Sequence, residues 1–345
     1  MSESEQRPDS VHFVGSIALD SVDEVFKTCG RTLGRRLRRI PDGEPGGRRL
    51  WISWQYPLLR ASPYLSPAEG GIESGQQNLR LADGVDPANI RFGELGYCRE
   101  ARISYQDFAA ARSRGDIAEG VRFQVSLPTP FAVIAAFVPG PDMQPVLGAY
   151  EKAMIKEAQA ICAAIPHEDL CIQWDVCIEM VAWDGQPSVI PPIPNKEHVL
   201  PAVVAKMVDS IPEDVQVGIH LCYGDLDAKH FVEPVDAERM VSFANAITSV
   251  SRHPLAYVHM PVPIARDDDA FFQPFADLKL GSSTELYLGL IHDDGQEAVQ
   301  RRIDAASRHA PKFGVATECG IARQRTPEKV ESLIRAHAAA TREPA

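Results

Sequence analysis

Short runs of apolar, β-prone residues alternate along the chain with longer stretches whose apolar positions recur at helical spacing. The eight β-like runs are 11–17, 37–41, 123–127, 170–176, 215–223, 255–262, 285–292 and 313–319. The helix-like stretches are 21–33, 145–164, 201–210, 236–251, 296–309 and 327–340. Strands that alternate with helices pair in parallel through crossovers, and eight such units close a barrel. The pattern therefore predicts an α/β fold, a (β/α)8 TIM barrel.

One stretch does not follow this alternation. Residues 50–116 are rich in Gly, Pro and Arg and carry only one further β-like run, 90–98. We interpret this stretch as a long excursion after the second strand. Because loops that follow barrel strands line the active-site face, we expect it to cover the site. Since no low-complexity linker interrupts the chain, we predict one barrel domain over 11–345, preceded by a flexible N-terminus over 1–10.

Composition and charge narrow the classes of partner. Of the 345 residues, 45% are hydrophobic, which is enough to fill one large core. The net charge of −12 argues against a nucleic-acid partner, because phosphate binding needs clustered Lys and Arg. The start of the chain is polar and acidic, and no apolar run approaches the ~20 residues of a membrane span. We therefore expect a cytoplasmic protein without a membrane partner. The pattern does not indicate an oligomeric state.

The strongest chemical signal is the segment VGIHLCYGD. On a strand, residues i and i+2 point to the same side, so His220 and Cys222 share one face at the end of an apolar run. The segment VATECG places Cys319 at the end of the last predicted strand. Taken singly, each of these residues is more often structural, but one imidazole and two thiolates that converge suit Zn²⁺. Three protein ligands leave one position for substrate.

The other cysteines give no such signal. In a reducing compartment they are free thiols or metal ligands. Those without a His at strand spacing are interpreted as core or surface thiols, namely Cys29, Cys98, Cys162 and Cys171. Cys177 follows Asp175 by two positions, and we interpret it as a packing residue.

The combination of His220-x-Cys222 with a distant Cys319-Gly320 pair resembles the C-terminal catalytic domain of cobalamin-independent methionine synthase. The resemblance covers nearly the whole chain. IHLCY is similar to the strand that supplies two zinc ligands in that family, and ECG is similar to its Asp-Cys-Gly segment, which supplies another thiolate. The resemblance implies a TIM barrel, a zinc cofactor and methyl transfer to a thiol.

Further segments resemble the family in the same order along the chain. FVGS is similar to its Ile-Gly-Ser segment, which implies that Ser16 holds a substrate carboxylate. PDGEPGGR and IQWDV resemble two acidic segments, which implies that Glu44 and Asp175 lie side by side and hold a substrate ammonium group. VSLPTP resembles its Thr-Gly-Pro-Val-Thr strand. LYLGLIHDD resembles the segment with the proton-handling residue, which is His292 here.

The chain also departs from that family. The family's glutamate zinc ligand has no equivalent in AYVHMPVP, where His259 either replaces it or orders the pocket. The acidic residue expected after Asp175 is Val176. The tryptophan on which folate stacks is replaced by FAVIAAF, near Ala135 and Ala136. Loss of a stacking platform costs about 1–3 kcal/mol. A folate donor is therefore not expected unless Trp51, Trp54 or Trp174 supplies another platform.

These observations predict a zinc-dependent methyl or alkyl transferase. Its partners would be a small thiol acceptor, such as homocysteine, and an alkyl donor. Zinc would supply the thiolate, since a free thiol with a pKa of about 8.5 is mostly protonated at neutral pH. Two alternatives remain open: a zinc-dependent lyase or hydrolase on the same barrel, and a non-catalytic ligand-binding relative.

Overall fold

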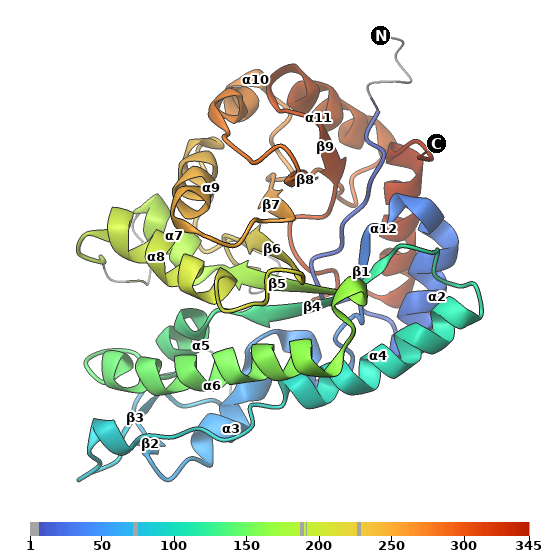
Figure 1. The fold of residues 1–345 in the computed structure, drawn as a ribbon. Coiled ribbons are helices and arrows are strands. Elements are labelled where there is room, and N and C mark those ends of the chain that lie inside the picture. The colour runs from blue at the N-terminus through green and yellow to red at the C-terminus, as the bar shows by residue number, and fades with distance from the viewer. Residues whose placement is uncertain (1–6, 72–74, 187–189, 191, 226–228, 345) are drawn as a thin grey trace.

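Seven parallel strands form one sheet in the computed structural model, which describes residues 7–71, 75–186, 190, 192–225 and 229–344. The strands are β1 (Arg39–Pro41), β4 (Arg122–Pro128), β5 (Leu170–Val176), β6 (Gln216–Leu221), β7 (Tyr257–Pro261), β8 (Glu285–Gly289) and β9 (Phe313–Val315). Their order in the sheet is their order in the chain, and helices surround them (Figure 1). The fold is a mixed α/β fold of the TIM-barrel type.

The longer helices are α2 (Val22–Leu33), α4 (Tyr97–Ser113), α6 (Met143–Ala164), α8 (Lys196–Val208), α9 (Glu238–Val250), α11 (Gln296–His309) and α12 (Pro327–Ala340). Most of the longer helices connect successive strands of the sheet, whereas α2 precedes β1 and α12 follows β9. Shorter helices are α3 (Tyr56–Arg60), α5 (Pro130–Phe137), α7 (Ile178–Asp184) and α10 (Asp269–Phe272). Local sequence fixes several starts: the Ser21 and Thr326 hydroxyls cap α2 and α12 by accepting from backbone N–H groups. Within the described ranges, none of the helices combines the length and apolar character needed to cross a membrane.

The strand predicted over 11–17 is not formed as a continuous strand. Its backbone makes isolated parallel bridges on both sides, from Val11 to Leu37 and Val315 and further along to Gly43 and Ile321. The segment therefore lies between the two edge strands β1 and β9. The carbonyls of Phe13 and Val14 accept hydrogen bonds from inward-pointing glutamine side chains instead of from a neighbouring strand. A complete eight-stranded barrel remains a prediction.

The chain between β1 and β4 also differs from expectation. The β-like run predicted over 90–98 is wrong, because α4 begins at Tyr97. The carboxylate of Glu157 on α6 accepts from the backbone N–H groups of Leu95 and Cys98, both at 2.7 Å, and so caps this helix start. The additional strands of this region lie elsewhere, in the antiparallel pair β2 (Leu65–Pro67) and β3 (Leu79–Leu81). This pair and α3 lie at the periphery, away from the parallel sheet (Figure 1).

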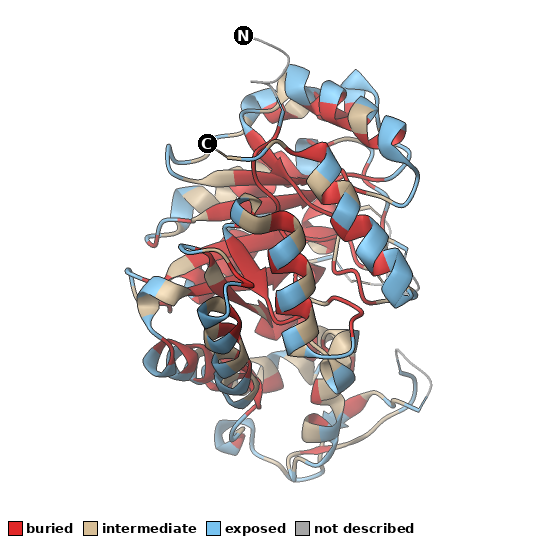
Figure 2. Cartoon of the chain, turned by 90° about the vertical axis from the view of Figure 1, so that its right-hand side faces the viewer, coloured by how far each residue is buried: buried red, intermediate tan, exposed pale blue. Residues whose placement is uncertain are grey.

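Burial is concentrated on the parallel sheet and on the helix faces that cover it (Figure 2). Strand β5 is buried at every position, as expected for a parallel strand covered on both faces. At the amino ends of the strands the interior is polar. There the buried Arg39 donates to Gln216 at 2.8 Å and to Glu285 at 2.6 Å, and its guanidinium lies over the Tyr257 ring.

Candidate metal centre

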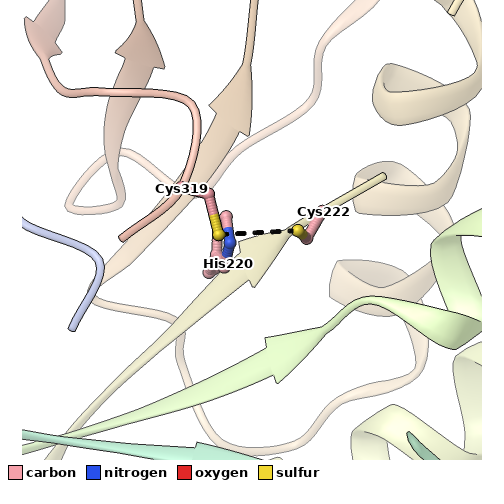
Figure 3. A group of neighbouring side chains, drawn as sticks. All are labelled: His220, Cys222 and Cys319. Carbon is pink, nitrogen blue, oxygen red and sulfur yellow. Dashed lines mark hydrogen bonds between the residues drawn. The ribbon is translucent and has the colours of Figure 1, made fainter. Parts of the chain in front are cut away.

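His220, Cys222 and Cys319 converge at the carboxyl end of the sheet (Figure 3). His220 is the last residue but one of strand β6, which ends at Leu221, and Cys222 follows directly. Cys319 lies in the loop after β9, which ends at Val315 rather than at the predicted position 319. The ligand atoms of the three side chains lie within 4.8 Å of one another, and the two sulfurs are 3.9 Å apart. The predicted convergence of these three residues is therefore present.

Local backbone features hold the two thiols in place. The Gly224 N–H donates to the Cys222 sulfur at 3.3 Å, and Gly224 has the positive φ of 93° that favours glycine. The Thr317 hydroxyl donates to the Cys319 carbonyl at 2.8 Å. Gly320 allows close packing against Ser16, since a Cβ there would come within 2.2 Å of the Ser16 hydroxyl oxygen. Close packing against Ser16 therefore favours a glycine directly after Cys319.

The chemistry of this group fits a bound metal ion. His220 is 1% exposed, and its Nε2 atom is buried without a hydrogen-bond partner among the described residues. A buried polar atom without a partner is costly, and a metal ion would relieve that cost. Burial lowers the pKa of His220, which keeps the imidazole neutral, as a ligand must be. The neighbouring Cys177 thiol and burial raise the pKa of Cys222, and the Cys222 thiol and burial raise the pKa of Cys319. A bound cation would lower both pKa values.

His259 lies behind His220 rather than among the ligands. The two residues are register partners on β6 and β7, and their Nδ1 atoms are 2.6 Å apart. The Nε2 atom of His259 is 3.0 Å from the Thr317 carbonyl oxygen. Both ring nitrogens of His259 are therefore engaged within the protein. Among the described residues, the group able to hold a metal contains only His220, Cys222 and Cys319.

Asp175 ends up next to the candidate ligands. It is the register partner of His220 in the pairing of β5 with β6. One of its oxygens accepts from Gln173 at 2.8 Å, and the other accepts from the Trp51 indole at 3.1 Å. Burial raises the pKa of Asp175 to about 7. This carboxyl group is therefore oriented by two donors and titrates near neutral pH.

Glu44 lies close to Asp175, as predicted. Burial raises the pKa of Glu44 well above its ordinary range, and the charges of Asp175 and Asp42 raise it further. The nearby Arg48 donates to the Asp42 carboxylate at 2.8 Å. Glu44 lines a cavity that also contacts Trp51. Its φ of 51° is unusual for a residue with a side chain and is typical of functional sites.

Ser16 and His292 lie on either side of the Cys319 loop. The Ser16 carbonyl accepts from the Ile321 N–H at 2.7 Å, which places Ser16 between this loop and the Glu44 segment. His292 Nε2 donates to the Val262 carbonyl at 2.9 Å, and its Nδ1 is 3.6 Å from the Glu318 carboxylate. Burial lowers the pKa of His292 to about 4 and raises that of Glu318 to about 8. The roles assigned to Ser16, Glu44, Asp175 and His292 from sequence stay predictions.

Three residues of this region make contacts that the sequence analysis did not predict. Trp51 reaches Asp175 from the segment after β1, with an unusual φ of 55°. Cys177, interpreted as a packing residue, does pack in the cluster that contains Cys222 and also touches the Cys222 thiol. The Glu318 carboxyl group lies 3.6 Å from the Nδ1 atom of His292. Only Glu318 carried a local signal, because it adjoins Cys319. The contacts of Trp51 and Cys177 depend on how distant segments pack.

A buried metal-ligand group at the carboxyl ends of parallel strands, in a TIM-barrel-like fold, is the arrangement of barrel enzymes. No protein-family model and no curated protein matches the chain. Solved structures do. The chain is similar to a B12-independent methionine synthase from a Shewanella species in complex with selenomethionine, with 12% identity, 97% of each chain covered and a TM-score of 0.63.

A second similar structure is a Listeria monocytogenes protein provisionally named a vitamin-B12-independent methionine synthase. It has 14% identity and a TM-score of 0.57, with 98% of this chain and 99% of that chain covered. At such low identity the likeness shows the fold alone. The protein therefore has a methionine-synthase-like fold, in agreement with the resemblance found in its sequence.

Proposed function

We propose that this protein is a zinc-dependent methyl or alkyl transferase whose acceptor is a small thiol of the homocysteine type. The observation that supports this most directly is the convergence of one imidazole and two thiols around the unpartnered Nε2 of His220. Such a donor set is typical of zinc, and three protein ligands leave one position for substrate. The methionine-synthase-like fold favours transfer over other reactions of the same barrel.

The metal would be held by His220, Cys222 and Cys319. When bound, zinc would supply a substrate thiolate at neutral pH, where a free thiol with a pKa of about 8.5 is mostly protonated. The remaining steps belong to the side chains of the chain itself. The pair of His292 and Glu318, whose Nδ1 atom and carboxyl oxygen are 3.6 Å apart, would give a proton to the leaving group of the donor.

Substrate orientation is assigned to the acidic pair. Asp175 is held by Gln173 and Trp51, and Glu44 lies beside it, so an ammonium group between the two carboxylates would be fixed by charge-assisted hydrogen bonds. Ser16 would donate to the carboxylate of the same amino acid. Fixing both ends of an amino-acid thiol directs its sulfur to the Cys222 and Cys319 side. The selenomethionine bound in the similar Shewanella structure is an amino acid of this size.

The donor is proposed to be different from methyltetrahydrofolate. The FAVIAAF segment lies in helix α5 (Pro130–Phe137). Six of the eight residues of this helix are buried. Ala135, near the expected position of the folate platform, offers no aromatic surface. Trp51 is committed to a hydrogen bond with Asp175. We expect methionine formation from methyltetrahydrofolate and homocysteine to be absent or poor. Ordinary turnover of that pair, measured as methionine formed, would contradict this assignment of the donor.

Binding of a thiol to the metal tests the proposal. Cobalt is substituted for zinc, and the absorption spectrum is recorded while homocysteine or 4-mercaptobutanoate, which lacks the amino group, is added. We expect a new sulfur-to-metal charge-transfer band and proton release, seen in calorimetry as a buffer-dependent enthalpy. A lyase or hydrolase would keep water on the metal. If no thiol in a broad panel changes the cobalt spectrum, the transferase proposal fails.

A matched variant examines the acidic pair in the same assay. Glu44→Gln keeps the size of the side chain and removes its charge. We expect it to weaken binding of homocysteine by about tenfold, the effect of one charge-assisted hydrogen bond of about 1.5 kcal/mol. Binding of 4-mercaptobutanoate should change much less, because it has no ammonium group. Equal losses for both thiols would exclude the proposed role of Glu44.

A further inference from the structure

A chain of hydrogen bonds runs from a backbone carbonyl through two buried imidazoles. The His259 Nε2 atom lies 3.0 Å from the Thr317 carbonyl oxygen, and the Nδ1 atoms of His259 and His220 are 2.6 Å apart. Both rings are buried, His259 at 0% and His220 at 1% exposed. The Nε2 atom of His220 has no partner within the described residues. These contacts determine where the protons must be.

The carbonyl oxygen of Thr317 can only accept, so the Nε2 atom of His259 carries a hydrogen. In a neutral imidazole the other nitrogen is then a lone pair, and the Nδ1 atom of His259 is an acceptor. Two nitrogens 2.6 Å apart need one hydrogen between them. That hydrogen belongs to Nδ1 of His220. The Nε2 atom of His220 is consequently a lone pair, as metal ligation requires.

The reverse arrangement is unfavourable. If His259 carried hydrogens on both nitrogens, its Nδ1 would donate to His220, which would then carry its own hydrogen on Nε2. That buried N–H would have no acceptor, at a cost of about 1–3 kcal/mol. A buried imidazolium without a paired carboxylate would add a further cost. The contacts therefore select one tautomer for each ring.

We propose that His259 is a positioning residue that fixes the tautomer and orientation of the metal ligand His220. This inference rests on the metal site proposed above. His259 also connects the two halves of that site, because Thr317 stands two residues before Cys319 and its hydroxyl donates to the Cys319 carbonyl. The same loop thus holds one thiol directly and orients the imidazole through His259. This role differs from that of a metal ligand, which His259 was also considered to be.

Nuclear magnetic resonance of the metal-free, full-length protein with ¹⁵N-labelled histidine tests the tautomers without any metal. Long-range ¹H–¹⁵N correlations distinguish protonated from unprotonated ring nitrogens. We expect a hydrogen on Nδ1 of His220 and on Nε2 of His259. A hydrogen on Nε2 of His220 would overturn the proposal. Because no metal is present, this result stands even if the protein binds no zinc, and a zinc-binding failure alone would count against the proposed function.

Two substitutions at position 259 supply the second readout. His259→Met keeps a similar volume, but its thioether sulfur is only a weak acceptor for the His220 N–H and has no hydrogen to donate to Thr317. We expect it to move the His220 hydrogen toward Nε2 and to lower zinc affinity by about 10–100-fold, the range for partners that orient a metal ligand. His259→Gln offers an oxygen to His220 and an amide N–H to Thr317, and it should recover much of the affinity. Zinc affinity within about twofold of the parent protein in His259→Met would overturn the proposal.

Discussion

The two ends of the parallel sheet contain different kinds of buried polar cluster. At the amino ends of the strands, Arg39 is paired with Gln216 and Glu285, and Tyr287 also donates to Glu285. At the carboxyl ends, the Nε2 atom of His220 has no hydrogen-bond partner among the described residues, and neither does one oxygen of Glu318. Both clusters consist of polar side chains at or near strand ends. They differ in whether the polar atoms satisfy one another.

The difference separates structure from function. Buried polar groups are normally paired because an unpaired one costs about 1–3 kcal/mol. The Arg39 cluster has no such deficit and needs nothing from outside. The His220 cluster is incomplete by itself, so a ligand would stabilise it. Substitutions at the two ends should therefore have different consequences. Those at the amino ends should lower stability, and those at the carboxyl ends should weaken ligand binding.

The largest expected effect is on zinc binding. Cys222→Ser or Cys319→Ser should lower zinc affinity by more than about 100-fold, since even residues that only orient a ligand contribute 10–100-fold. The parent protein should purify with about one equivalent of zinc. Elemental analysis and competition with a chelator measure both. The control is Cys98→Ser, the same change at a half-buried thiol outside the cluster. Unchanged zinc content in both cluster variants would remove the proposed site.

A smaller effect, on stability, is expected at the other end. Arg39→Met should lower the free energy of unfolding of the metal-free protein by about 2–3 kcal/mol, below the 3–5 kcal/mol of a fully buried pair. The reason is that the Glu285 side chain is 37% exposed and keeps part of its hydration. Urea denaturation measures this change. Zinc affinity should stay at the parent value. If zinc affinity fell as far as in the Cys222 variant, the two ends of the sheet would not have separate roles in stability and binding.

The smallest effect is a change in selectivity with pH. The pKa of Asp175, raised to about 7 by burial, means that this carboxyl gains a proton as the pH falls from 8 to 6. Binding an ammonium group at pH 6 then requires loss of that proton. The preference for homocysteine over 4-mercaptobutanoate should therefore decline at pH 6, by up to about tenfold for one pK unit. Ionisation of the thiol affects the binding of both compounds, so it cancels in the ratio of their affinities. A ratio that rises at pH 6 would contradict this assignment.

Much of the fold could be predicted from local pattern. The strand 170–176 and the helices 296–309 and 327–340 have the predicted bounds. Local signals decide such elements, because the period of apolar positions and the cap residues belong to the segment itself. The same holds for the core of the site. The i, i+2 spacing puts His220 and Cys222 on one side of a strand, whatever packs around it.

Other features were decided by contacts between distant residues. Backbone N–H groups at 95 and 98 are taken by Glu157, which favours a helix start over the predicted strand. The carbonyl of Val14 is taken by Gln124 and Gln173, about 110 to 160 positions away, which replaces regular strand pairing. A local pattern cannot reveal these side-chain partners. Each of these backbone groups could equally well bond to a backbone group in a strand or a helix, and only the packing of distant segments decides between the two.

The sequence by itself determined which three residues could form a metal site, since their chemical types and strand spacing are local properties. Only the tertiary structure decided how that site is supported. It set His259 behind His220 instead of among the ligands, and it brought Trp51 onto Asp175. It also paired Arg48 with Asp42 and left Glu44 facing a cavity. These outcomes depend on which donors and acceptors meet when separate strand ends come together, and folding alone fixes that geometry.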